Sequence, residues 1–88
     1  MINFTIKHKE HFEHYLFGSA LYSENPSDLD LAIIYDKKHI SVQEAIIYRN
    51  ELIDNLSKVI PLKIDTILLS KDEEIETEFL SNAKHRLI

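Results

Sequence analysis

The chain contains no cysteine and no tryptophan, and it has one glycine and two prolines among 88 residues. Without cysteine it can form neither a disulfide nor a thiolate metal site, which fits a cytoplasmic location. No apolar run approaches the roughly 20 residues that a membrane-spanning helix needs. The segment Met1–Lys7 also lacks the long apolar core of a signal peptide. We therefore expect neither a membrane association nor export.

Positive charge is also scarce, because 10 Lys and Arg residues stand against 15 Asp and Glu residues, a net charge of −5. Proteins that bind nucleic acid neutralise phosphates with a surplus of Lys and Arg, so stable nucleic-acid binding is not expected. The hydrophobic content of 44% and the charged content of 28% are typical of a globular chain. At this length we expect one domain over residues 1–88. Its small core favours a partner protein or a homo-oligomer.

The apolar pattern predicts alternating helices and strands. Two segments have the capping-box form that begins a helix, with Ser41 and Glu44 in one and Ser70 and Glu73 in the other. The expected elements are a short helix over Thr5–Phe12, strands over His14–Phe17, Leu29–Tyr35 and Leu62–Leu69, a helix over 41–59 and a last helix to about residue 83. The expected fold class is α/β (α+β), a small mixed sheet of about three strands flanked by helices.

Asp28 and Asp30 lie at the start of the clearest strand, where aspartate is unusual. Residues two apart on a strand point to the same face, about 6.6 Å apart along the chain. Both carboxylates can then reach one divalent cation or a close pair of cations. The alternative is a solvent-facing strand end with two solubilising aspartates.

Asp65 lies inside the other strong strand, where an unpaired charge is costly. If the two strands are neighbours, Asp65 can lie beside Asp28 and Asp30. Three clustered carboxylates would repel one another unless a metal bound them, and some of their pKa values would rise. The alternative is an edge-strand aspartate paired with Lys63 or another cation.

Gly18-Ser19 follows a strand and precedes the aspartate pair, a position that suits phosphate binding. Glycine permits a tight turn and a close approach of the backbone, and successive N–H groups at such a turn favour an anion. The cations Lys37, Lys38 and Arg49 could neutralise a triphosphate, although the sequence favours ordinary surface charges for them.

His8, His11 and His14 are spaced by three, which brings neighbours together on a helix and suggests zinc. However, His8 and His14 would be about 240° apart around a helix axis. One ion could not bind all three, so a solvated face or a partner contact is the better interpretation.

Three segments together resemble the DNA polymerase β-like nucleotidyltransferase superfamily. They are Leu16-Phe17-Gly18-Ser19, Ser27-Asp28-Leu29-Asp30-Leu31 and Ile64-Asp65-Thr66-Ile67-Leu68. The sequence is most similar to the stand-alone minimal nucleotidyltransferase (MNT) domains, and the likeness extends from about residue 12 to about residue 80.

The resemblance implies a role for each site residue. Gly18 and Ser19 would hold the β- and γ-phosphates of a nucleoside triphosphate. Asp28 and Asp30 would bind two Mg²⁺ ions, and Asp65 would share one ion and help to activate the attacking hydroxyl. The implied reaction transfers a nucleoside monophosphate, with AMP from ATP as the expected case, and releases pyrophosphate.

The resemblance also implies a partner, because larger relatives carry a helical domain that this sequence lacks. Such minimal domains often act with a helical HEPN-type protein, as the antitoxin to this ribonuclease toxin, and in some cases they nucleotidylate the toxin. In the loop after the Gly-Ser pair, Ala20–Ser23 replaces the Arg and Gly of many relatives. This difference favours an alternative function, a non-catalytic module that neutralises a partner by contact.

Overall fold

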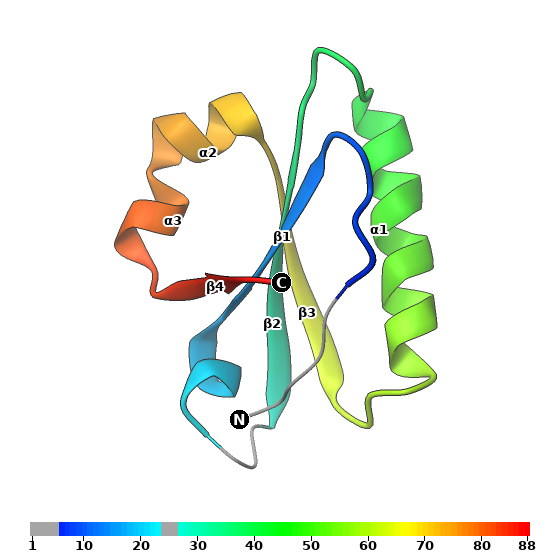
Figure 1. The fold of residues 1–88 in the computed structure, drawn as a ribbon, viewed down its shortest axis with the longest axis vertical. Coiled ribbons are helices and arrows are strands. Elements are labelled where there is room, and N and C mark those ends of the chain that lie inside the picture. Colours follow the sequence, from blue (N-terminus) through cyan, green and yellow to red (C-terminus); the bar gives the residue numbers. More distant parts are fainter. Residues whose placement is uncertain (1–5, 24–26) are drawn as a thin grey trace.

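Four strands form one mixed sheet in the computed structural model, which describes residues 6–23 and 27–88. The strands are β1 (Phe12–Phe17), β2 (Asp28–Tyr35), β3 (Lys63–Ser70) and β4 (His85–Leu87), in the order β3-β2-β1-β4. β1 runs antiparallel to both β2 and β4, whereas β2 and β3 are parallel. The helix α1 (Val42–Ser57) connects β2 to β3 and lies on one side of the strands (Figure 1).

Three shorter helical segments complete the described chain: η1 (Gly18–Leu21), α2 (Lys71–Thr77) and α3 (Phe79–Asn82). α2 and α3 lie across the strands from α1 (Figure 1). No helix of the described residues is long and apolar enough to cross a membrane.

The central strand β2 alternates as expected. Leu29, Leu31 and Ile33 are fully buried on the face that packs toward α1, and this alternation fixes the register of the strand. On the opposite face Ala32 and Ile34 are buried too. Only the first part of β2 therefore presents half-buried polar side chains.

Both expected capping boxes are present. The Glu44 N–H donates to the Ser41 hydroxyl at 3.1 Å, and the Ser41 N–H donates to the Glu44 carboxylate at 3.3 Å. Ser70 and Glu73 make the same pair of bonds at the start of α2. These local bonds satisfy N–H groups that a helix leaves free at its first turn, so α1 and α2 begin where the sequence predicts.

The short helix expected over Thr5–Phe12 is wrong for its described part, and Thr5 lies outside the described residues. His11 has a φ of 70°, in the left-handed region, where a right-handed helix cannot continue. Phe12 already belongs to β1, where every second side chain is buried: Phe12, His14 and Leu16. The period-two pattern therefore decides the structure here.

The last helix is also shorter than expected, because it breaks at Glu78. That residue has a φ of 52° and separates α2 from α3. After α3 the chain forms β4, a fourth strand that the sequence analysis did not include. β4 has three residues, and its hydrogen-bonding partner β1 lies at the far end of the sequence. Such a segment is too short to carry a recognisable alternation.

Candidate functional site

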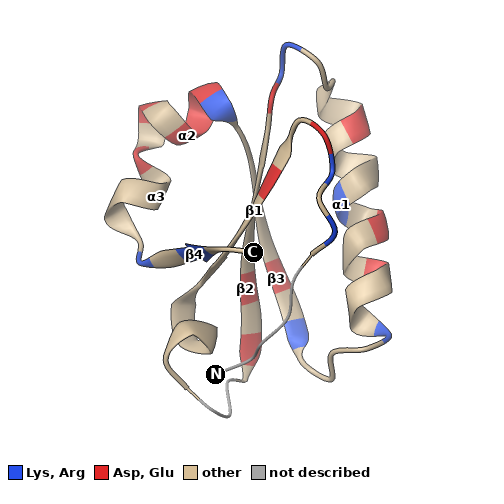
Figure 2. Ribbon diagram, viewed as in Figure 1, with Lys and Arg blue, Asp and Glu red and all other residues tan. Residues whose placement is uncertain are grey.

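The three aspartates lie side by side on the sheet. In the parallel pairing of β2 and β3, Asp30 is directly opposite Asp65, and Asp28 is opposite Lys63. Neighbouring strands are about 4.8 Å apart, and alternate residues share a face. All three carboxylates therefore lie on the sheet face away from α1. Acidic bands on β2 and β3 are visible next to one another in Figure 2.

The electrostatics of this acidic site are those of crowded like charges. Burial raises the pKa of Asp30, and the charges of Asp65 and then Asp28 raise it further. Lys63 Nζ lies 3.7 Å from Asp65 Oδ1, so the expected alternative partner is present. Yet the two side chains are 74% and 47% exposed, and an ion pair in water contributes little. Lys63 thus leaves most of the repulsion in place.

Gly18 lies against the acidic site. Its φ is 74°, and a Cβ built there would overlap Asp30 Oδ2 and lie 3.1 Å from Asp30 Cγ. Phe17, the residue before it, pairs with Asp30 across β1 and β2. Only glycine therefore fits at this position, where the backbone that begins η1 lies directly beside the Asp30 carboxylate.

Ser19 is the second residue of this turn, and its side chain is exposed. Its carbonyl accepts the N–H groups of Tyr22 at 3.1 Å and Ser23 at 2.9 Å. These bonds close η1 into one tight turn beside the aspartates. Gly18 and Ser19 are thus next to the acidic site, as the sequence predicts, with a hydroxyl at the surface.

An open hollow borders this turn. It has a volume of about 560 Å³ and lies between η1 and the segment from α3 to β4. Tyr22 is 66% exposed, and Lys84 Nζ lies 6.0 Å from the centre of its ring. An aromatic face and an ammonium group therefore border the hollow.

The donor set of the acidic site fits a hard divalent cation. Mg²⁺ takes oxygen ligands and is commonly bound by one or two carboxylates together with phosphate oxygens. Burial is the main cause of the raised pKa of Asp30, and a cation would offset the further contribution that comes from repulsion by Asp65 and Asp28. Asp28, Asp30 and Asp65 are the residues that would hold it.

The other candidate cations lie away from this site. Lys37 follows the opposite end of β2, where its Nζ lies 2.9 Å from Asp72 Oδ2. Lys38 is exposed in the same turn, and the Arg49 guanidinium on α1 contacts Asn50. The interpretation of these three residues as surface charges fits their positions.

The three histidines of the N-terminal segment do not share a helix. His14 belongs to β1, is 4% exposed, and its Nε2 lies 2.6 Å from the Tyr48 hydroxyl on α1. Burial lowers the pKa of His14, and His8 lowers it further. A solvated face was therefore the wrong interpretation for His14, although it holds for the exposed His8.

His11 lies instead beside Asp36 and His39, a group that the sequence analysis missed. The pairing of Phe12 with Tyr35 brings the residue before β1 next to the residue after β2. Spacing along the chain gives no sign of this contact, because only the antiparallel pairing creates it.

The sequence of the chain also matches a known family. The family model described as Polymerase beta, Nucleotidyltransferase matches residues 1–86. No curated protein and no solved structure gives a significant match.

Proposed function

This chain belongs to the polymerase beta nucleotidyltransferase family, and on that premise we propose that it transfers AMP from ATP to a hydroxyl of a protein partner. The observation that carries the proposal is the pairing of Asp30 with Asp65 on neighbouring parallel strands. It gathers carboxylates from two separate segments on one face, next to the only glycine of the chain.

Each residue of the site has a chemical task in this reaction. Asp28, Asp30 and Asp65 would hold two Mg²⁺ ions, which when bound neutralise charge on the attacking and leaving oxygens. Asp65 would also take the proton of the acceptor hydroxyl. The hydroxyl oxygen then bonds to the α-phosphorus of ATP, while the bond to pyrophosphate breaks. Phosphoryl transfer needs positioning and charge neutralisation more than covalent help from the protein.

The turn and the hollow beside it suit the nucleotide. Gly18 and Ser19 would hold the β- and γ-phosphates, with the backbone in close approach and the Ser19 hydroxyl as a donor. The exposed Tyr22 ring offers a stacking surface for a base. The neighbouring Lys84 supplies positive charge, which the segment Ala20–Ser23 does not.

We further propose that the acceptor is a helical HEPN-type protein and that the chain is the MNT antitoxin of the pair, acting in the cytoplasm as a single domain over residues 1–88. On α1 the exposed apolar residues Val42, Ile46 and Ile47 offer a surface for such a partner.

The decisive experiment is a transfer assay with α-labelled ATP and Mg²⁺, with the co-purified partner present or absent. Asp28→Asn and Asp65→Asn each remove one carboxylate and should reduce labelling of the partner by at least about 100-fold. Asp54→Asn is the matched control, because Asp54 is an exposed aspartate on α1. It should leave labelling unchanged.

A second function, neutralisation of the partner by contact alone, is favoured by the unusual loop Ala20–Ser23. It predicts tight partner binding without label, and binding that Asp28→Asn and Asp65→Asn do not change. Labelling that survives both substitutions would remove the acidic site from the mechanism.

A further inference from the structure

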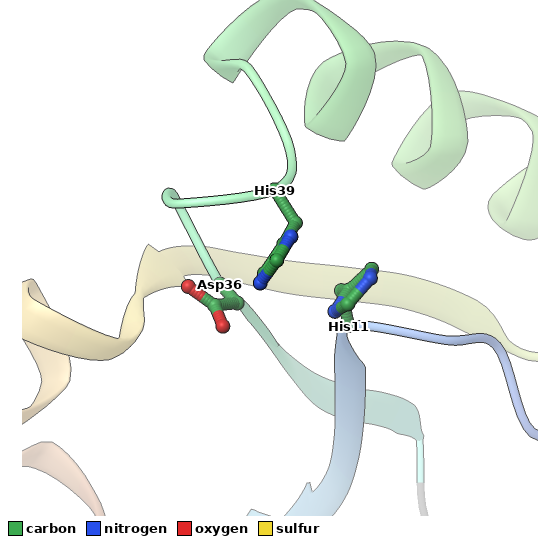
Figure 3. A group of neighbouring side chains, drawn as sticks. All are labelled: His11, Asp36 and His39. Carbon is green, nitrogen blue, oxygen red and sulfur yellow. The ribbon is translucent and has the colours of Figure 1, made fainter.

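A second cluster of ligating side chains lies where β2 ends. His11 directly precedes β1 and Asp36 directly follows β2, and the Asp36 N–H donates to the His11 carbonyl at 3.0 Å. In the following turn the His39 N–H donates to the Asp36 carbonyl, also at 3.0 Å. Backbone bonds of the fold thus hold all three residues together (Figure 3).

The side chains of these residues converge. One ligand atom of each, a ring nitrogen or a carboxylate oxygen, lies within 4.8 Å of the other two. The two imidazole rings are stacked, with their centres 4.1 Å apart and 10° between their planes, and the Asp36 carboxylate lies beside them (Figure 3). Asp36 Oδ1 accepts the Lys38 N–H at 3.0 Å, which leaves Oδ2 for another partner.

We propose that His11, Asp36 and His39 bind a divalent transition-metal ion, with Zn²⁺ as the best match. Two imidazoles and one carboxylate are a common zinc donor set, in which water takes the fourth position. Mg²⁺ and Ca²⁺ prefer oxygen ligands alone, so this set discriminates against the ions suited to the acidic site. Neither His39 nor Asp36 is buried, so solvent reaches the cluster.

Binding requires a small rearrangement of the cluster. Tetrahedral Zn²⁺ with bonds of about 2.0–2.2 Å places ligand atoms about 3.3 Å apart. The lone pair of each imidazole lies in the plane of its ring, so the stacked rings must tilt toward a common point. The exposed side chain of His39 is in a short turn and can rotate, whereas His11 is fixed by the start of β1.

The surrounding charges are mixed. The Glu10 carboxylate lies 3.7 Å from His11 Nε2 and adds negative charge beside the cluster. Lys71, at the start of α2, adds positive charge near Asp36. Lys37 is already paired with Asp72.

The two sites are far apart, so the second cluster takes no part in the proposed nucleotidyl transfer. Asp36 follows Asp30 by six positions along an extended strand, which corresponds to about 20 Å. A metal here would tie the segment before β1 to the connection between β2 and α1. Nucleotidyl transfer and this binding can therefore succeed or fail independently.

The test uses the full chain, free of bound metal, titrated with Zn²⁺ by calorimetry and by thermal unfolding. We expect one Zn²⁺ per chain and a melting temperature that rises with Zn²⁺ concentration. His39→Gln and Asp36→Asn should each weaken Zn²⁺ binding at least 10-fold, while an excess of Mg²⁺ should not compete. His8→Gln removes an exposed histidine of the same segment outside the cluster, so it should bind as the parent does.

Two results would overturn the proposal. One is an absence of Zn²⁺ binding by the parent protein. The other is Zn²⁺ binding that survives His39→Gln and Asp36→Asn, most directly if Asp30→Asn abolishes it, since the ion would then belong to the acidic site.

Discussion

Gly18 cannot be replaced by alanine without a cost, for two reasons. The φ of 74° is strained for any residue with a Cβ, and the Asp30 carboxylate occupies the space that this Cβ would take. Left-handed backbone alone costs about 1–2 kcal/mol for a non-glycine residue. We expect Gly18→Ala to lower the free energy of unfolding by about 2–3 kcal/mol in urea denaturation. Ser19→Ala, at the exposed neighbour, should stay within about 0.5 kcal/mol of the parent. Equal stability of both variants would contradict the close contact.

Asp30 should be a site where charge destabilises the metal-free protein. Its folded-state pKa lies above the ordinary value of 3.8, so the folded chain binds more protons than the unfolded chain between these two values. The contribution of Asp30 to the free energy of unfolding therefore falls as the pH rises through that window. Asp30→Asn removes the charge, and the melting temperature at pH 7 without metal should rise by about 2–4 °C. Mg²⁺ should stabilise the parent but not the variant. A variant that melts below the parent in the absence of metal would show that the carboxylate is already neutralised.

Among the elements, β1 and α1 are joined by the bond between His14 and Tyr48. The pKa of His14 is lowered in the folded state, so the unfolded chain binds more protons as the pH falls below 6.5. Stability should therefore fall from pH 7.5 to pH 5.5. His14→Phe should reduce this pH dependence. The exposed histidines are present in both proteins, so the difference in pH dependence between parent and variant is the contribution of His14. If both proteins lose the same stability in urea denaturation at the two pH values, His14 is not the group responsible.

The capping box of α1 can be tested with two serines. Ser41→Ala removes the hydroxyl that accepts the Glu44 N–H and should lower the free energy of unfolding by about 1 kcal/mol. Ser57→Ala, at the exposed last position of the same helix, should change it by a few tenths at most. The comparison uses urea denaturation of both variants. Similar losses would mean that the cap adds nothing to α1.

At the scale of the elements, most correct predictions came from patterns within a few neighbouring residues. Ser41 and Glu44, three positions apart, predict the start of α1. The alternation around Asp28 and Asp30 predicts that both carboxylates lie on one face of β2. The grouping with Asp65 could be anticipated because it needs only that β2 and β3 are neighbours. β4 could not be predicted, since three residues become a strand only through pairing with β1. The cluster of His11, Asp36 and His39 has the same origin, in a contact between chain segments.

At the scale of the whole molecule, the central strand β2 carries one candidate metal site at each end. The two are about 20 Å apart along an extended strand, and they share no ligand. Asp30→Asn and Asp36→Asn should therefore have additive effects on the free energy of unfolding, within about 0.5 kcal/mol. The double variant and both single variants are compared in urea without metal. A coupling above about 1 kcal/mol would show that the sheet transmits a change from one end to the other.

The parallel pairing of β2 with β3 has a consequence for the protein during its synthesis. On the ribosome, β1 and β2 can pair as soon as both have emerged, because they adjoin in sequence and run antiparallel. Asp65, however, arrives only after all of α1 has been made and β3 has docked beside β2. A nascent chain that stops short of β3 thus holds Asp28 and Asp30 without their third carboxylate, and the acidic group is complete only on a chain whose translation has passed that strand.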